Sequence, residues 1–352
     1  MKILPIPHSK PYLGQDEIDA AIRVLKSGMI ALDGEVRRFE KKFKKLIERK
    51  YAIAVNSGTS ALHLSLLSLK MSGNDEVIIP SYVCPALLNA VNYTGAKPVI
   101  ADVSAYDGNI SPDSVRKKIT SKTKAIIVPH LFGIPADIKE IISFGIPVIE
   151  DCAQSLGAEY DGKLTGRFGR VAVFSFYATK VIATGEGGMI VCDNERIHKT
   201  ILDLRSYDKK KNYSVRYNYK MTDLSASLGI AQLSKLKRMI SKRRKIASQY
   251  SKRISLPNVI HHSFDERKKS IYYRYIIKIK RGNVKKVIGE YRKRGIFAEK
   301  PIYYPLHRYL KMNLKDYKGA EECFKKFVSL PIYPSLTEEE INRIVKASLE
   351  IF

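Results

Sequence analysis

Two short segments of the chain carry side chains that could act together in amino-group chemistry. Asp151 and Gln154 lie in the first segment, and Ser175 and Lys180 lie in the second. Pyridoxal 5′-phosphate (PLP) needs a lysine amine to hold its aldehyde and an acid at its pyridine nitrogen, so that the ring can withdraw electrons. Each of these residues taken alone has a common structural explanation. Their combination predicts a PLP site.

The residues on either side indicate which elements must position these groups. Asp151 follows the apolar run Ile146–Ile149, which is typical of a buried parallel strand, and functional side chains collect where such strands end. A carboxylate there stays ionised chiefly when a cation, such as a protonated pyridine, pairs with it. Ser175 lies in a second apolar run, Val171–Phe176, where a hydroxyl could bind phosphate, and Lys180 follows in a loop.

The longer pattern predicts an α/β protein, a large domain with a mostly parallel sheet between helices and a smaller C-terminal α+β domain. Strands and helices alternate through the first part of the chain, as in parallel sheets covered on both faces. The expected strands are Val77–Pro80, Val99–Asp102, Ala125–Pro129, Pro147–Asp151, Val171–Phe176 and Met189–Cys192. One long helix, residues 224–254, is expected to lead out of this domain.

The pattern changes near residue 255, which sets the predicted boundary between a large domain, residues 1–254, and a small one, residues 255–352. We expect a strand at 271–279, a helix at 284–294 and a terminal helix at 337–351. Thr337, with Glu340 three residues later, forms the sequence signature of a helix start.

Several motifs in this order resemble those of the DegT/DnrJ/StrS-type PLP-dependent sugar aminotransferases. The motifs are Asn56–Leu62, Glu150–Gln154, Ser175–Lys180, Tyr217–Asp223, Tyr304–His307 and Leu330–Leu336. The resemblance runs almost from end to end. It implies the fold type I architecture of the aspartate-aminotransferase superfamily.

The resemblance also implies a role for each residue around the cofactor ring. Lys180 would form the Schiff base and move the proton between substrate and cofactor. Asp151 would pair with the pyridine nitrogen, and Gln154 would bond the phenolic oxygen of the ring. Ala153 would pack on one ring face, where a larger side chain would not fit.

A second group of residues would bind the phosphate. Gly58 and Thr59 would offer amides at a helix start, where unpaired N–H groups and the helix dipole favour an anion. Ser175 would complete this shell. Asn218 is similar to the residue that reaches the phosphate from a neighbouring subunit in the family, which implies a homodimer with shared active sites.

Other positions depart from the family pattern or have two interpretations. Cys84 stands near the position where many members have an aromatic residue against the ring. Tyr177 replaces a common His or Asn and is expected near the substrate, and Lys220 replaces a common Arg. His130 and His307 could each touch substrate or order a loop, and the resemblance places His307 at the substrate cleft.

The cysteine content and the lengths of the apolar runs limit the classes of protein to which this chain could belong. The four cysteines are widely spaced and form no CxxC pair, so we expect neither a metal site nor disulfides, and a cytoplasmic location. No apolar run approaches the roughly 18 residues of a membrane span, and the N-terminus does not resemble a signal peptide. We therefore expect no membrane association.

The net charge of +27 raises the possibility of a polyanionic partner. The lysines alternate with apolar residues at helical spacing, as in residues 35–47, which favours solvated helix faces over a nucleic-acid site. A regulatory or nucleic-acid-binding protein on the same fold remains an alternative, but it would not need Lys180 and Asp151 together.

The predicted activity is transfer of an amino group from an amino acid, by resemblance L-glutamate, to a keto-sugar in amino-sugar and polysaccharide biosynthesis. The acceptor is expected to be a nucleotide-linked 4-keto-6-deoxy sugar, because residues 184–188 look more like those of C4-acting members of the family. A PLP-dependent sugar dehydratase is the other alternative. Members with that activity replace the lysine, whereas this chain keeps Lys180.

Overall fold

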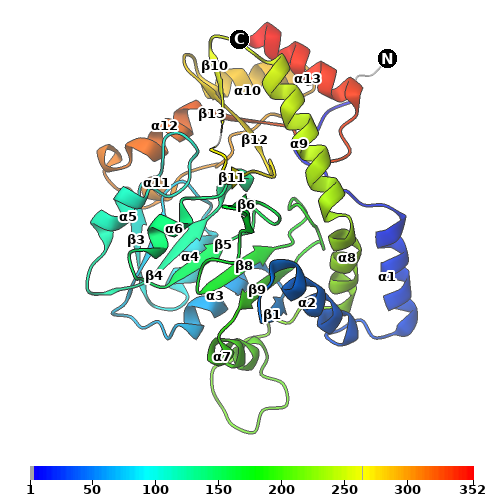
Figure 1. The fold of residues 1–352 in the computed structure, drawn as a ribbon, viewed down its shortest axis with the longest axis vertical. Helices are drawn as coiled ribbons and strands as arrows, with labels where there is room; N and C mark the ends of the chain where they lie inside the picture. The colour runs from blue at the N-terminus through cyan, green and yellow to red at the C-terminus, as the bar shows by residue number, and fades with distance from the viewer. Residues whose placement is uncertain (1–3, 264) are drawn as a thin grey trace.

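A computed structural model describes residues 4–263 and 265–352. Its centre is a seven-stranded sheet of order β1-β9-β8-β5-β4-β2-β3 (Figure 1). The strands are β1 Tyr51–Val55, β2 Glu76–Pro80, β3 Lys97–Ala101, β4 Thr123–Pro129, β5 Val148–Asp151, β8 Val171–Ser175 and β9 Gly188–Cys192. β9 runs antiparallel to both neighbours, and all the other neighbouring pairs are parallel.

Helices cover both faces of this sheet because its strands are apolar on both sides. Along β1, Ile53 and Val55 pack into the core beneath α3, while Ala52 and Ala54 pack on the other face with α2. The helices of this part are α1 Gln15–Ser27, α2 Gly34–Ile47, α3 Gly58–Ser68, α4 Ala86–Asn92, α5 Pro112–Lys118, α6 Ile138–Ile142, α7 Glu195–Arg205, α8 Asp223–Ser234 and α9 Leu236–Arg253.

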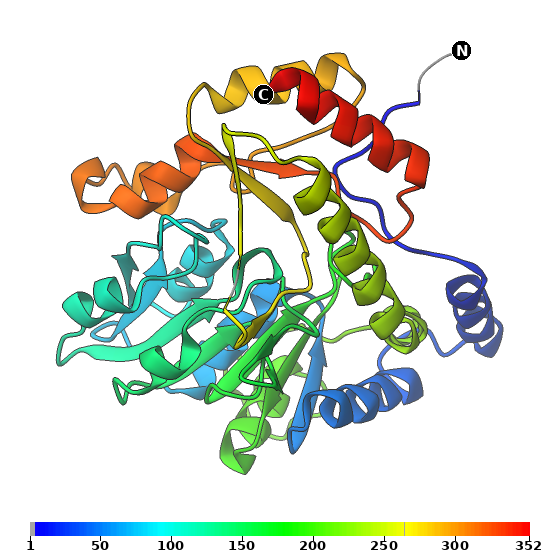
Figure 2. The ribbon, with the colours of Figure 1, turned by 45° about the horizontal axis from the view of Figure 1, so that its top comes forward.

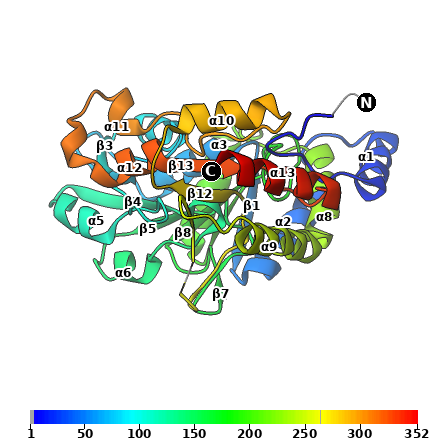
Figure 3. The same ribbon diagram turned by 90° about the horizontal axis from the view of Figure 1, so that it is seen from above.

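A second unit stands over one edge of the central sheet (Figure 2). Its three-stranded sheet has the order β10-β12-β13 and packs against α10 and α13, which lie over it in Figure 3. Its elements are β10 Val259–His261, β12 Tyr275–Ile279, α10 Val284–Lys293, α11 Leu306–Tyr309, α12 Lys318–Lys326, β13 Phe327–Leu330 and α13 Glu338–Ile351. A small third sheet joins β6 Glu159–Tyr160, β7 Lys163–Leu164 and β11 Lys268–Lys269.

The six predicted strands are present, with bounds within two residues of those expected. The sequence pattern missed β1. The single long helix is instead two helices that meet at Lys235. The strand expected at 271–279 starts only at Tyr275, because Tyr272 has the left-handed φ of 49°, which no strand residue adopts. Thr337 and Glu340 cap α13 reciprocally, as predicted.

The hydrophobic cores cross the predicted domain boundary at residue 254. Ile6 packs in the core of the C-terminal unit, and its N–H bonds the carbonyl of Gly295 at 2.8 Å. In the other direction, Leu306 and Phe327 pack in the core of the central sheet. The division into two sequential domains therefore stays a prediction. In the part of the chain that the structure describes, no helix is both long and apolar enough to cross a bilayer.

Candidate active site

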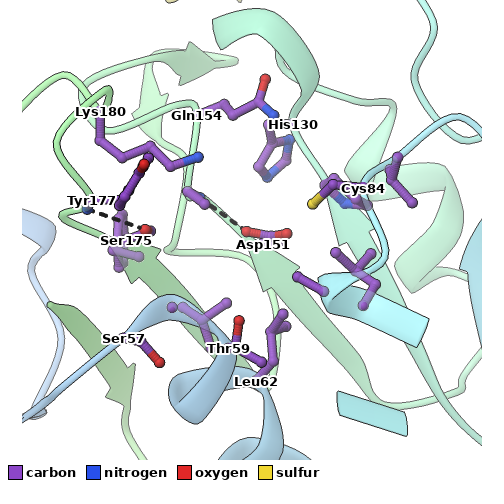
Figure 4. A pocket seen from close by; sticks show the side chains of 18 of the residues that line it. Ser57, Thr59, Leu62, Cys84, His130, Asp151, Gln154, Ser175, Tyr177 and Lys180 are labelled. Carbon is purple, nitrogen blue, oxygen red and sulfur yellow. Dashed lines mark hydrogen bonds between the residues drawn. The ribbon is translucent and has the colours of Figure 1, made fainter. Parts of the chain in front are cut away.

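A pocket of about 350 Å³ lies where the parallel strands β4, β5 and β8 end (Figure 4). Open parallel sheets bind ligands at this edge because the loops that follow the strands diverge there. Most of the side chains that the sequence singled out line it. They are Gly58, Thr59, Cys84, Asp151, Ala153, Gln154, Ser175, Tyr177 and Lys180.

Asp151 ends β5 and is a nearly buried acid, 8% exposed. Its Oδ1 accepts a hydrogen bond from the N–H of Ala153 at 3.0 Å, and no lysine, arginine or histidine of the described residues forms an ion pair with it. Burial raises the pKa of Asp151, which the Ala153 bond and the charge of Lys180 offset only in part. A protonated pyridine nitrogen is the kind of cation that this carboxylate lacks.

Lys180 lies in the loop after β8, and its amine points into the pocket (Figure 4). Its backbone N–H bonds the carbonyl of Tyr177 at 2.8 Å, which forms the turn that directs the side chain. The Nζ atom lies 5.4 Å from the ring centre of Tyr273. No carboxylate among the described residues pairs with this amine, so it is available to an aldehyde.

The first turn of α3 forms the floor of the pocket. Ser57 caps the helix by accepting a hydrogen bond from the N–H of Ser60 at 3.0 Å. A Cβ on Gly58 would lie 2.8 Å from the Cβ of Ser175, so only glycine lets the helix start meet the end of β8 this closely. Unpaired amides at a helix start, beside the hydroxyls of Thr59 and Ser175, suit a phosphate group.

Gln154 is oriented by the backbone of a neighbouring loop. Its Oε1 accepts a hydrogen bond from the N–H of Phe132 at 2.8 Å. Phe132 has a φ of 60°, an uncommon conformation for a large residue, and it turns this N–H toward Gln154. With the amide oxygen occupied, the NH₂ group of Gln154 is the end left to donate, as the phenolic oxygen of PLP requires. These residues fit PLP.

His130 also lines the pocket, but it is fully buried. Its Nε2 lies 3.1 Å from Glu150, and its Nδ1 accepts from the N–H of Ala136 at 3.0 Å. Glu150 and Cys152 complete a group whose possible metal-ligating atoms lie within 4.8 Å of one another. Because Glu150 also accepts bonds from three loop amides, hydrogen bonds already use the ring nitrogens of His130 and the carboxylate of Glu150. This group orders the loops behind Asp151.

Two predicted residues lie outside the pocket of their own chain. Asn218 is exposed, and its carbonyl accepts from the side chain of Asn56 at 3.3 Å. His307 is fully buried, with its Nε2 3.0 Å from Glu321 and its Nδ1 against the hydroxyl of Ser81. The expectation that His307 faces the substrate cleft is corrected, because both of its ring nitrogens are engaged inside the protein.

Tyr273 is a neighbour of Lys180 that the sequence did not single out. Its ring is 7% exposed and lies against Lys180, and its hydroxyl is 3.4 Å from that of Thr179. Burial would raise the pKa of Tyr273, but the positive charges of Lys180 and Arg274 bring it below the ordinary value. Tyr273 stands in a run of tyrosines assigned to a strand, and no local signal set it apart.

Solved structures and curated sequences match the chain along nearly its whole length. DesV from S. venezuelae superimposes with a TM-score of 0.93 at 28% identity, covering 99% of this chain and 98% of that one. Spr1654 of Streptococcus pneumoniae in its PLP form gives a TM-score of 0.92 at 25% identity, covering 99% and 100%. The GDP-perosamine synthase of Escherichia coli O157:H7 is 33% identical over 367 residues, covering 100% of this chain and 99% of that protein.

The fold and the pocket together define a fold type I PLP-dependent aminotransferase. The chain belongs to the DegT/DnrJ/EryC1/StrS aminotransferase family, whose model matches residues 11–348. The predicted family, fold class, cofactor and enzyme class are thereby confirmed.

Proposed function

We propose that this enzyme transfers the amino group of L-glutamate to a nucleotide-linked 4-keto-6-deoxy sugar. One observation carries the proposal: an unpaired lysine amine, an unpaired buried acid and a helix start suited to phosphate meet in one pocket. Proteins named GDP-perosamine synthase from three organisms, 31% to 33% identical to this chain, support a GDP-linked sugar as the acceptor.

The roles proposed for these residues are those that the family resemblance implies, and their positions in one pocket support them. When bound, PLP supplies an aldehyde for the amine and a ring that withdraws electrons from the substrate carbon. Asp151 would keep the ring nitrogen protonated, and Gln154 would donate to the phenolic oxygen. Lys180 would hold the cofactor through its amine and would carry the proton between the substrate carbon and the cofactor carbon. Ala153 and Cys84 would pack on the ring, and Tyr177 would lie on the substrate side; all three line the pocket.

The amides of Gly58 and Thr59 and the hydroxyl of Ser175 would hold the phosphate of the cofactor. We further propose that Asn218 completes this shell in a second copy of the chain, because it is exposed and lies outside its own pocket. An apolar face on α1 is available to such a copy, since Ile18, Ile22 and Leu25 are 52%, 44% and 58% exposed. All four cysteines are free thiols, in keeping with a cytoplasmic enzyme.

The first half-reaction provides the direct test. L-glutamate added to the purified PLP-loaded enzyme should abolish the visible absorbance of lysine-bound cofactor and release one equivalent of 2-oxoglutarate. A GDP-linked 4-keto-6-deoxy sugar added next should restore the absorbance and yield the amino sugar, which mass spectrometry would detect.

Each half of this experiment can fail separately. Loss of absorbance with another amino acid but not with L-glutamate would change the donor. Restoration by UDP- or dTDP-linked keto-sugars, but not by the GDP-linked one, would change the nucleotide. If no amino acid alters the spectrum, the proposed half-reaction with an amino-acid donor is wrong.

A further inference from the structure

The ring of Tyr273 lies against the amine of Lys180, although the two residues come from distant parts of the chain. The Nζ atom lies 5.4 Å from the ring centre, within the roughly 6 Å over which the face of an aromatic ring attracts a cation. The hydroxyl of the same tyrosine lies 3.4 Å from that of Thr179, the residue before the lysine. Tyr273 therefore contacts the lysine loop at two points, and one of them is the amine itself.

No anion among the described residues takes the place of this ring. The titratable groups that line the pocket around the amine are Cys84, His130, Asp151, Tyr177 and Glu186. Asp151 attracts the amine without forming an ion pair with it, and Glu186 forms none either. Arg274 lies 5.8 Å from the centre of the same ring and contacts Glu299 at 3.8 Å. The ring of Tyr273 is therefore the side chain that holds the amine in place.

Arg243 of α9 fixes the backbone that carries this ring. Its Nη1 group donates to the carbonyl of Tyr273 at 3.2 Å, and also to those of Tyr272 and Ile332 at 3.3 and 3.0 Å. The guanidinium is 4% exposed and forms no ion pair in the part of the chain that the structure describes. Burial lowers the pKa of Arg243 to about 10. A buried cation without an anion costs free energy, so an apolar residue would fill this place better if packing alone mattered.

The loop after β4 holds the other side of the same segment. The N–H of Ile271 bonds the carbonyl of Gly133 at 3.1 Å. A Cβ on Gly133 would lie 2.8 Å from the backbone nitrogen of Tyr273, and the φ of 84° also favours glycine there. The segment is thus held between α9 and the wall of the PLP pocket. Its ring cannot leave the amine of Lys180 unless these hydrogen bonds break.

We propose that Tyr273 is a positioning residue for Lys180, because the face of its ring binds the protonated amine whenever the cofactor does not hold that amine. The proposal rests on the role proposed for Lys180. In that role the amine takes a proton from the α carbon of the donor and becomes positively charged, before it gives the proton to the cofactor carbon. A ring face stabilises the charged amine and leaves the neutral amine almost unaffected.

Chemical labelling of the PLP-free protein tests this contact without any turnover. Acetic anhydride reacts with neutral amines, and peptide mass spectrometry would measure how fast Lys180 is acetylated. Tyr273→Leu should raise this rate about five-fold near neutral pH, because loss of the cation–π contact leaves more of the amine neutral. In strong base the two rates should become equal, since the amine is neutral in both proteins. The exposed Lys163 is the internal reference and should react equally in both.

Tyr273→Phe is the matched control, because it keeps the ring face and removes only the hydroxyl beside Thr179. Its Lys180 should be labelled as in the wild type. Tyr273→Met should behave like Tyr273→Leu, which makes the result independent of the shape of the new side chain. A faster rate that persists in strong base would mean that the substitution only opened access to the amine. That outcome, unchanged labelling in the two apolar variants, or an equal rise in Tyr273→Phe would overturn the proposal.

A single turnover with L-glutamate gives a second measurement. Tyr273→Leu should slow the loss of visible absorbance about ten-fold at saturating donor, with little change in the donor concentration that gives half the maximal rate. Tyr273→Phe should keep most of the rate, and an equal loss in both variants would contradict a role for the ring face. Failure of the wild type to react with L-glutamate would count against the proposed function alone, because the labelling experiment needs neither donor nor acceptor.

Discussion

Two polar clusters of this molecule contain the same kinds of groups and differ in what is left unpaired. The PLP pocket holds an acid and an amine, Asp151 and Lys180, that form no ion pair with any of the described residues, and hydroxyls lie in the same lining. A second group, here called the His307 cluster, consists of Ser81, His307, Arg308 and Glu321 and is saturated. In that cluster Glu321 accepts two bonds from Arg308 and one from His307, and it pairs with Lys325.

The contrast separates a group of residues that can bind a ligand from a group that only stabilises the fold. A saturated buried cluster stabilises its surroundings and has no capacity left for a ligand, although its Ser-His-Glu order resembles a hydrolase triad. An unsaturated cluster costs folding free energy, and a ligand that completes it recovers that energy as binding. Residue types alone do not distinguish the two, because both contain charged and hydroxyl side chains close together.

The largest effect is expected for Lys180→Ala. The variant should lose at least about 10⁴-fold in turnover, because no other lysine of the pocket lining can hold the cofactor or carry the proton. Its unfolding free energy should change little, since the amine makes no ion pair. Absorbance spectra, single-turnover kinetics and urea unfolding would measure this. Lys163→Ala, an exposed lysine of β7, is the control, and comparable losses in both would contradict the assignment.

In the His307 cluster, Glu321→Gln should lower the unfolding free energy by about 3 kcal/mol, because Arg308 and Lys325 lose their anion. Its partners hold the pKa of Glu321 at about 2 despite the opposing effect of burial. The stability it contributes is thus present above the unfolded pKa of about 4.3 and is lost as pH falls toward 2.

Urea unfolding at several pH values would check this expectation. The neighbouring Glu322→Gln removes an ion pair with Lys278 that is more exposed, and it should cost less than about 1 kcal/mol. If the two variants cost the same, the cluster is not the saturated structural unit described here.

Asp151→Asn should act in the opposite sense, stabilising the PLP-free protein at neutral pH by about 1–2 kcal/mol. Burial raises the pKa of Asp151, so the folded protein favours the protonated acid. The stability that the protonated acid contributes is present at low pH, and it is lost as the pH rises from the unfolded pKa of about 3.9 through the folded pKa. The difference between variant and wild type should therefore vanish in acid. Thermal unfolding of both proteins across pH would reveal it.

PLP supplies the internal control for this prediction. With the cofactor bound, the pyridine nitrogen pairs with Asp151, and the variant should lose its advantage in stability together with cofactor affinity. A destabilised PLP-free Asp151→Asn protein would mean that this acid is already paired, contrary to the contrast drawn above.

The smallest effects are expected for two serines. Ser81→Ala should cost about 1 kcal/mol of stability, because it leaves a ring nitrogen of buried His307 without its partner. Ser175→Ala should leave stability nearly unchanged and weaken PLP binding, since its hydroxyl faces the pocket. Parallel unfolding experiments and PLP titrations would measure both effects. A loss of stability in Ser175→Ala together with weaker PLP binding in Ser81→Ala would contradict the contrast between the two clusters.

Local signals were sufficient for much of the site. Apolar runs that end in Asp151 and Ser175 predicted strands, and strand ends of one parallel sheet must meet at one edge. Gly58 and Thr59 were named from the family resemblance, and the rule that helix starts bind anions gives the physical reason. These inferences needed only periodicity and motif order, which act over a few residues at a time.

The sequence by itself predicted six strands of the central sheet, the family and most of the residues that line the pocket, because these depend on burial patterns, motifs and residue chemistry along the chain. Tertiary structure alone decided that His307 points inward and that Tyr273 lies beneath Lys180. The direction of a side chain and the pairing of its charge depend on neighbours distant in sequence. Those neighbours come together only when the chain packs.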